Sequence, residues 1–385
     1  MSKRFLTTII IFTLMINIVL PCIQAAPQPS SIAAALLDFD TGRFLYLKNA
    51  DQPLAPASIT KIMTLFLAFD ALEAGSVQLQ QNFTVSKRAA AVGESTMWLA
   101  EGDRVSFEQL IKGVAIASGN DASFALAEAV SGTVELFIDQ MNKKAATLGL
   151  ASAHFSNTHG LDEDDHLISA RDIAMLGYYL IKEHPEALNY TSQTEMTFSG
   201  EGFLTSRNPL LGVYEGADGL KTGYTDASLN SLLATAKRGD IRLISVIVGA
   251  IDENVRYRET VELLNYGFSD NFERRALFKT DDVLEQVLNV RRAEQDQITL
   301  TLARQVDAVI DVAYPEAFTT SFDIPAQMDA PISKGDVVGQ MTLFYDNIPL
   351  EIVDIVAAED SGEAGFFKSL WQSIVEFFSG LFRFK

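Results

Sequence analysis

The pattern of the chain changes near residue 268. Before this point, segments with helical apolar spacing alternate with strand-like apolar runs. From about residue 280 to 356, short β-rich runs such as QITLTLA and EIVDIVAA are separated by Gly and Pro. The first pattern predicts an α/β layered domain with an antiparallel sheet, and the second predicts a small all-β domain. We therefore expect one domain over residues 27–267 and a β-rich domain over 268–357.

Six segments predict the elements of the first domain. Turn residues between two apolar runs predict hairpins, and apolar residues three or four apart predict helices. The expected elements are a hairpin over 32–51, a helix over 58–75, two helices over 107–130 that break at SGN, a helix over 170–184, two strands over 229–250 and a helix over 258–268.

The first 26 residues have the pattern of a secretory signal peptide. Two cations precede a short apolar run, and small residues follow it up to Ala26. An uncleaved anchor helix is one alternative. A lipoprotein signal at Cys22 is another, although Pro21 stands where such signals need a small residue. Cleavage near Ala26 would remove Cys22, which is the single cysteine, so no disulfide is expected in the exported protein.

The last 28 residues predict a linker followed by a helix at a membrane surface. Residues 358–365 are polar and small (AEDSGEAG). In the segment 366–385, apolar residues cover about half of the helical circumference, at roughly 100° per residue. Charged residues on the other half favour a helix that lies in the interface through residues 366–384 over one that spans the bilayer. The alternative is a terminal helix packed on its own protein.

Charge and histidine spacing exclude two classes of function. The chain carries 30 Lys and Arg against 50 Asp and Glu, a net charge of -20. We expect no nucleic-acid binding, because phosphate contacts need clustered cations. The four histidines lack the spacing of a zinc motif, and we expect neither a metal nor another cofactor.

Ser58 and Lys61 form the first candidate catalytic pair. They stand three residues apart at the start of an apolar helix pattern, so their side chains can share one helix face. A serine hydroxyl becomes a strong nucleophile when a base takes its proton. A lysine is such a base only when neutral, which requires burial or neighbouring cations. Taken alone, a helix-capping serine beside a lysine is the simpler interpretation.

Two further motifs carry polar side chains. Ser118 and Asn120 flank a Gly between two apolar helices, where a tight turn can aim both side chains into one cavity. Lys221 and Thr222 offer a cation and a hydroxyl to a carboxylate, and Gly223 leaves room for a substrate backbone. Taken alone, these are an ordinary helix-cap turn and a turn at a sheet edge.

The three motifs occur in the order found in penicillin-binding proteins and class A β-lactamases. The chain resembles the low-molecular-weight D-alanyl-D-alanine carboxypeptidases, penicillin-binding proteins of the type 5/6 group. The resemblance rests on PASITKIMT, ASGNDA, NTHGLD, ARDIAML and DGLKTGYT, and extends from about residue 30 to the C-terminus. It implies an α/β/α catalytic domain, a β-sandwich-like domain and a membrane-surface helix.

The resemblance also implies the roles of the first two motifs. Ser58 would attack the carbonyl between the terminal D-alanines of a peptidoglycan pentapeptide, and Lys61 would take its proton. The backbone N–H groups of Ser58 and Tyr224 would form the oxyanion hole. Ser118 would pass a proton to the departing D-alanine, and Asn120 would bind the substrate amide. Water would release the acyl-enzyme, and penicillins would inhibit by acylating Ser58.

The terminal carboxylate of the substrate has a separate implied site. Lys221 would hold the serine of the second motif and a local positive field, while Thr222 would bind the carboxylate. Arg256 corresponds to a supporting arginine of the family, with Arg258 and Arg207 as alternatives. Some family members carry His where this chain has Tyr224, so only a backbone role is expected there.

Three alternative functions remain open. A class A β-lactamase needs a glutamate after the second motif, but Glu186 of PEALN lies far downstream of Asn120, and its spacing to Asn189 is one residue short. A D,D-endopeptidase would use the same residues on peptide cross-links. A non-catalytic cell-wall protein would keep the fold and dock partners through its β-rich domain.

Overall fold

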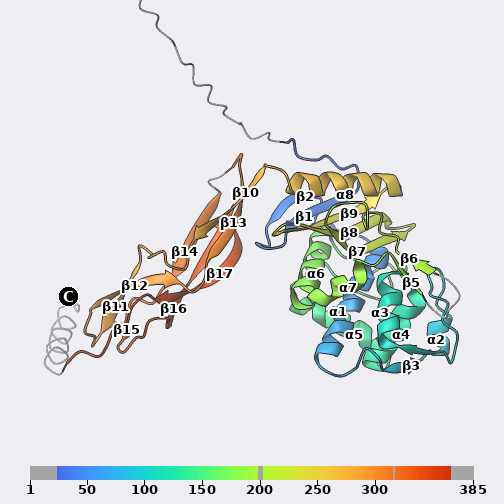
Figure 1. The fold of residues 1–385 in the computed structure, drawn as a ribbon, viewed down its shortest axis with the longest axis horizontal. Coiled ribbons are helices and arrows are strands. Elements are labelled where there is room, and N and C mark those ends of the chain that lie inside the picture. The colour runs from blue at the N-terminus through green and yellow to red at the C-terminus, as the bar shows by residue number, and fades with distance from the viewer. Residues whose placement is uncertain (1–23, 198–202, 315–316, 366–385) are drawn as a thin grey trace, which may run out of the picture.

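A computed structural model of the chain describes residues 24–197, 203–314 and 317–365 (Figure 1). Within these ranges no helix combines the length and the apolarity that crossing a bilayer requires. Nearly all of the predicted signal peptide and the whole predicted helix over 366–385 lie outside the described residues.

The first domain is built on a five-stranded antiparallel sheet with the strand order β2-β1-β9-β8-β7. The hairpin predicted over 32–51 is confirmed as β1 and β2, and the strand pair predicted over 229–250 is confirmed as β8 and β9. The strands are β1 Ala33–Asp38, β2 Phe44–Lys48, β7 Ala217–Thr225, β8 Leu229–Arg238 and β9 Ile241–Ala250.

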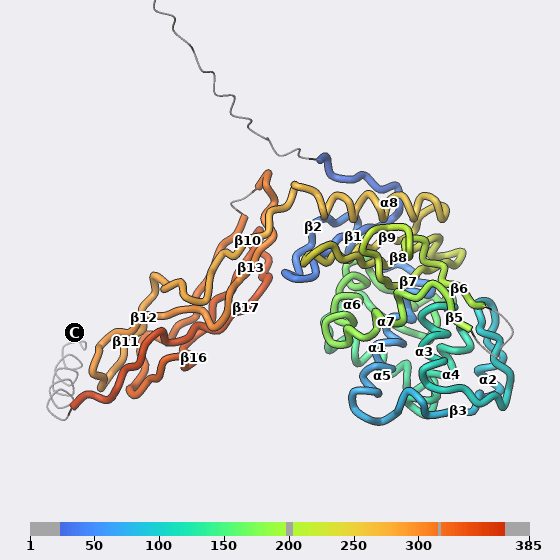
Figure 2. The backbone as a smooth tube through the Cα atoms, viewed as in Figure 1, coloured from blue at the N-terminus to red at the C-terminus, as the bar shows by residue number. Residues whose placement is uncertain are grey.

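Helices cover both faces of this sheet, which is the predicted α/β/α arrangement (Figures 1 and 2). Successive residues of β1 point to opposite faces. Ala33, Ala35 and Leu37 join the core on the side of α6, whereas Ala34 and Leu36 join the core beneath α8. The helices are α1 Lys61–Glu73, α3 Phe107–Ala115, α4 Asn120–Ser131, α5 Val134–Thr147, α6 Ala170–Glu183 and α8 Glu253–Gly267.

Polar caps set where several helices begin. Ser106 and Gln109 close a capping box at α3, and Ser169 accepts from the backbone N–H of the third residue of α6. Asp252 caps α8, so this helix begins at Glu253, five residues before the predicted start. Shorter elements complete the domain: η1 Ala57–Thr60, α2 Lys87–Ala90, η2 Pro185–Ala187, α7 Leu188–Thr191, β3 Asn82–Thr84, β4 Arg104–Ser106, β5 Glu195–Thr197 and β6 Phe203–Thr205.

The second domain contains only strands among its described residues, as predicted. A six-stranded sheet has the order β14-β16-β17-β12-β11-β15, and β10 pairs with β13. Alternating apolar residues of most of these strands form a core of their own, whereas Phe272 of β10 and Val309 of β13 join the core beneath α8. The strands are β10 Phe272–Phe278, β11 Val287–Arg291, β12 Gln297–Leu302, β13 Val306–Asp311, β14 Phe318–Asp323, β15 Met328–Asp329, β16 Val337–Tyr345 and β17 Ile348–Ala357.

Charged side chains join the two domains at the β1–β2 turn. Arg43 is 4% exposed, donates to the Val309 carbonyl and places its guanidinium carbon 3.6 Å from the centroid of the Tyr345 ring. Arg274 donates to the fully buried carboxylate of Asp38. The second domain therefore contacts the end of the sheet that carries β2, and β7 forms the opposite edge.

Candidate active site

The Ser58–Lys61 pair lies at the junction of η1 and α1. The sequence predicted that the helix starts at Ser58. In the structure Ser58 lies in the 3-10 turn η1, and the α-helix α1 begins at Lys61. The side chain of Lys61 is fully buried. Its Nζ lies 2.9 Å from Ser58 Oγ, 2.8 Å from Asn120 Oδ1 and 2.7 Å from the His159 carbonyl oxygen. The first two motifs therefore meet at one nitrogen.

The surroundings of Lys61 favour its neutral form. Burial is the main cause that holds its pKa well below the ordinary value, and the charge of Lys221 acts in the same direction. A neutral amine has two N–H groups and one lone pair. The oxygens of Asn120 and His159 can accept the two N–H groups, which leaves the lone pair for the Ser58 hydroxyl. The predicted burial of Lys61 is confirmed.

Two residues of this region, Ala57 and Ser118, have left-handed backbone conformations. Ala57, directly before Ser58, has a φ of 48°, and Ser118 has a φ of 60°. Non-glycine residues in this left-handed region cost on the order of 1–3 kcal/mol and persist only where the surrounding structure holds them. Ser118 is 5% exposed and lies directly before the short turn into α4.

Asn120 uses both ends of its amide. Its Oδ1 accepts from Lys61, and its Nδ2 donates to the Gly93 carbonyl at 2.9 Å. The second hydrogen of Nδ2 can still donate to a ligand. Asp121, which sequence reasoning missed, is buried and accepts from the backbone N–H groups of Met97 and Leu99. The start of α4 therefore holds the 93–99 loop beside the site.

A second missed feature is the turn Asn157–Gly160. Asn157 Oδ1 accepts from the N–H groups of His159 and Gly160, which orients the His159 carbonyl toward Lys61. Gly160 has a φ of 93°, and a Cβ there would lie 1.8 Å from the Ala57 carbonyl oxygen. The motif NTHGLD was the available signal, but no local pattern states that its glycine packs against the turn that carries Ser58.

The Lys-Thr-Gly motif lies on β7, next to η1. Lys221 and Thr222 are buried, 3% and 7% exposed. Lys221 donates to the Thr222 carbonyl, and no hydrogen bond from it to Ser118 occurs among the described residues. A Cβ on Gly223 would lie 3.0 Å from the Pro56 carbonyl oxygen and 3.1 Å from the Ala57 Cβ. The glycine therefore lets β7 pack closely against the serine turn, whereas the sequence argument had attributed it to substrate approach.

Three arginines were candidates for the carboxylate site. Arg256 is 3% exposed in the first turn of α8, and its Nε has no hydrogen-bond partner among the described residues. Arg258, by contrast, is exposed and pairs with Glu262. Burial lowers the pKa of Lys221 to about 7, with further contributions from the charges of Arg207 and Arg256. Arg207 and Arg256 therefore add to the positive charge around Lys221. Arg258, by contrast, lies at the surface.

Tyr224 follows the motif with its side chain in solvent. The side chain is 58% exposed, and its hydroxyl donates to Asp226 at 3.3 Å. Its backbone N–H stands on the same stretch of β7 that packs against η1. This placement fits a backbone role for Tyr224.

Metal-ligand candidates lie elsewhere in the described residues. Asp70, Glu73 and His184 bring three possible ligand atoms within 4.8 Å of one another. Asp70 already pairs with His184 and Lys144, so its charge is compensated. His184 also approaches Glu186 at 3.6 Å, which places this carboxylate beside that cluster.

Comparison with known proteins identifies the family. A sequence model described as D-alanyl-D-alanine carboxypeptidase matches residues 22–252. The chain belongs to the D-alanyl-D-alanine carboxypeptidase family. A second model, described as the C-terminal domain of penicillin-binding protein 5, matches residues 272–363. The family assignment confirms the resemblance and the predicted fold class.

Members of this family match almost the whole chain. D-alanyl-D-alanine carboxypeptidase DacF of Bacillus subtilis is 34% identical, over 94% of this chain and 96% of the relative. DacC of Escherichia coli is 36% identical, over 91% of this chain and 89% of the relative. The crystal structure of penicillin binding protein 5 from Haemophilus influenzae is 30% identical with a TM-score of 0.76, and covers 88% of this chain and 100% of that structure.

A similar penicillin-binding protein has been solved with a bound β-lactam. Penicillin-Binding Protein D2 from Listeria monocytogenes in its cefotaxime-bound form is 31% identical with a TM-score of 0.59. The match covers 64% of this chain and 100% of that structure. The family model, the curated relatives and the solved structures together identify this chain as a serine peptidase with a penicillin-binding-protein fold.

Proposed function

We propose that the chain is a serine D-alanyl-D-alanine carboxypeptidase that removes the terminal D-alanine of peptidoglycan pentapeptides through an acyl-enzyme on Ser58. One observation carries the assignment of the nucleophile: a fully buried Lys61 Nζ lies 2.9 Å from Ser58 Oγ. A neutral amine at this position takes the hydroxyl proton as the oxygen attacks the peptide carbonyl. The substrate follows from the carboxypeptidases to which the chain is similar.

The oxyanion of the tetrahedral intermediate needs two donors. We assign them to the backbone N–H groups of Ser58 and Tyr224. The packing of β7 on η1 through Gly223 supports this assignment, because it brings the two segments into contact. Preorganised backbone donors of this kind stabilise the transition state without further reorganisation.

Collapse of the intermediate breaks the peptide bond and releases D-alanine. The proton that Lys61 took from Ser58 passes through the Ser118 hydroxyl to the departing amine. Water then attacks the acyl-enzyme, with Lys61 again as the base, and restores the free serine. Asn120 binds the substrate amide through the hydrogen of Nδ2 that Gly93 leaves free.

The carboxylate of the terminal D-alanine binds at β7. Thr222 donates its hydroxyl, and Lys221 and Arg256 supply positive charge from buried positions. The free Nε of Arg256 supports this role, because a buried donor without a partner is costly unless a ligand satisfies it. β-Lactams present a similar carboxylate and acylate the same serine.

We also propose where the enzyme works. Residues 1–26 export the chain, 27–267 form the catalytic domain, 268–357 form the β-rich domain, and residues 366–384 rest on the membrane surface after a short linker. This places the enzyme at the extracytoplasmic face of the cytoplasmic membrane, where cell-wall peptides are found. Its action on these peptides connects it to wall biogenesis and cell shape.

Replacing the nucleophile tests the proposed reaction. We expect Ser58→Ala to lower D-alanine release from a monomeric pentapeptide by roughly 10⁴-fold or more, as for other serine nucleophiles. Ser123→Ala is the matched control, because this buried serine of α4 has no hydrogen-bond partner among the described residues. Cross-linked muropeptides are digested in parallel. Cleavage of cross-links without D-alanine release would establish an endopeptidase instead.

The two active-site lysines should give opposite limbs to the pH profile. Burial lowers the pKa of Lys61 well below 10.5, so activity falls as the pH drops through that pKa and the base becomes charged. Burial lowers the pKa of Lys221 to about 7, so its charge is present below about pH 7 and lost above it. We expect kcat/KM to show an alkaline limb near that pH. The arginine of Lys221→Arg stays protonated, so this variant should lose the alkaline limb of the profile. An alkaline limb at the same pH in this variant would show that another group causes it.

A further inference from the structure

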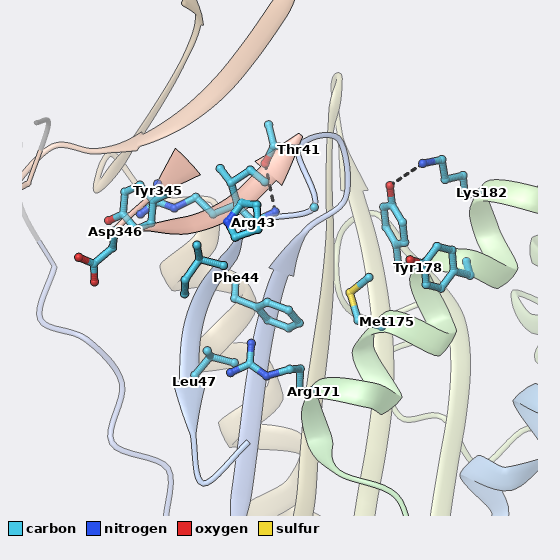
Figure 3. Close-up of a pocket in the computed structure, with 15 residues that line it drawn as sticks. Thr41, Arg43, Phe44, Leu47, Arg171, Met175, Tyr178, Lys182, Tyr345 and Asp346 are labelled. Carbon is cyan, nitrogen blue, oxygen red and sulfur yellow. Dashed lines mark hydrogen bonds between the residues drawn. The ribbon is translucent and has the colours of Figure 1, made fainter. Parts of the chain in front are cut away.

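A cavity of about 520 Å³ lies between the two domains, at the edge of the sheet opposite the catalytic serine. The β2 strand and its preceding turn form its floor, α6 forms one wall, and the hairpin between β16 and β17 forms the other (Figure 3). This volume falls in the range of small-molecule sites, roughly 300–1,000 Å³. The cavity shares no lining residue with the Ser58 site.

Cations line this junction cavity in a chain whose net charge is -20. Lys182 of α6 donates to the Tyr178 hydroxyl at 2.8 Å, and no ion pair of Lys182 occurs among the described residues. Arg171 is paired with Asp51, and its guanidinium lies over the ring of Phe44. Lys182 is therefore the cation whose charge remains available to a ligand.

Arg43 adds a second positive charge to the lining of the cavity. It is buried between the domains, and its Nε has no hydrogen-bond partner among the described residues. A buried guanidinium donor without a partner is costly unless a ligand or water satisfies it. Figure 3 shows Arg43 beside Tyr345 at one end of the cavity and Lys182 with Tyr178 at the other. Lys182 is therefore the donor that a ligand in the cavity can reach, while Arg43 adds positive charge at the other end.

The remaining lining indicates the rest of the ligand. Aromatic rings come from the floor and from both walls: Phe44, Tyr178, Tyr179 and Tyr345. Aromatic faces suit the apolar C–H faces of a sugar ring, and tyrosine hydroxyls can bond its hydroxyls. Asp346, the carboxylate that lines the cavity, can accept hydrogen bonds from sugar hydroxyls. We propose that the junction cavity binds an acidic sugar, with its carboxylate toward Lys182 and its ring on the aromatic side chains.

Binding by the full chain tests this site. N-acetylmuramic acid and N-acetylglucosamine share one ring and differ in a single acidic substituent, and neither carries D-alanine, so the result does not depend on the proposed catalysis. We expect calorimetry to show that the acidic sugar binds about tenfold or more tightly, as a charge-assisted hydrogen bond implies. Hydrogen exchange should slow at residues 41–47, which form the floor, and at residues 345–350, which form one wall.

Three variants assign the contacts. Lys182→Gln should weaken binding of N-acetylmuramic acid about tenfold, and Ile348→Ser, at the exposed rim, about threefold. Lys143→Gln, an exposed lysine of α5, is the charge-matched control and should change nothing. Equal affinity for the two sugars, or unchanged binding by Lys182→Gln, would overturn the proposal. So would Lys182-dependent binding to phosphatidylglycerol vesicles without sugar binding, which would assign the cavity to a lipid headgroup.

Discussion

Replacing Lys61 with glutamine should slow acylation of Ser58 by about 10³-fold, within the range for loss of a general base. The reason is geometric: Lys61 Nζ is the group within hydrogen-bond distance of Ser58 Oγ among the described residues, and the same nitrogen is held by Asn120 and His159. Glutamine can keep contacts to these oxygens but cannot accept a proton at neutral pH. The measurement is the second-order rate constant for a fluorescent penicillin.

Lys61→Arg separates a base from a simple positive charge. Arginine keeps the charge and stays protonated, so it should be as slow as the glutamine variant if the neutral amine is the base. Circular dichroism and the melting temperature show whether each variant folds, because Lys61 is fully buried. An arginine variant with near wild-type acylation would show that charge is sufficient, and would contradict the assignment of Lys61 as the base.

Gly160→Ala should impair acylation although Gly160 takes no part in the chemistry. Its added Cβ would lie 1.8 Å from the Ala57 carbonyl oxygen and 2.9 Å from the Ser58 nitrogen. The serine turn must therefore move, and a displacement of about 1 Å at a reacting group can cost about 100-fold in rate. The φ of 93° adds strain for any residue with a side chain. We expect a loss of at least this size in acylation, together with a melting temperature lower by several degrees.

Gly149→Ala is the matched control for this prediction. Gly149 also has a left-handed φ, 72°, but a Cβ there would meet open space. It should cost only the backbone strain, about 1–2 kcal/mol, and leave acylation unchanged. If both variants lowered the melting temperature equally and neither slowed acylation, the packing of Gly160 against Ala57 would not control the position of Ser58.

Local sequence patterns were sufficient to predict most of the fold. The hairpin at β1 and β2, the helix pair broken at SGN and the strands β8 and β9 each carry their signal within about 25 residues. Helix α5, Val134–Thr147, was not predicted, although Val134, Phe137, Met141 and Ala145 have the spacing of one buried helix face. Thr133 caps its start, which is a second local signal.

The candidate site was predictable only in part. The spacing of Ser58 and Lys61 indicates that their side chains can come into contact, and in the structure they do. The carbonyl of His159, by contrast, reaches Lys61 across 98 positions of the chain. Packing of Gly223 against the serine turn is likewise a long-range contact. Such contacts depend on how the sheet and the helices pack, which no short motif specifies.

The central claim is that Ser58 forms a covalent acyl-enzyme, and intact-mass analysis with a penicillin tests it most directly. We expect the wild-type chain to gain the mass of one penicillin, the adduct to persist after free drug is removed, and Ser58→Ala to gain nothing. The Ser123→Ala control should label like the wild type. An equal adduct on Ser58→Ala, or no adduct on the wild type, would contradict the account, and rapid loss of the adduct would favour a β-lactamase.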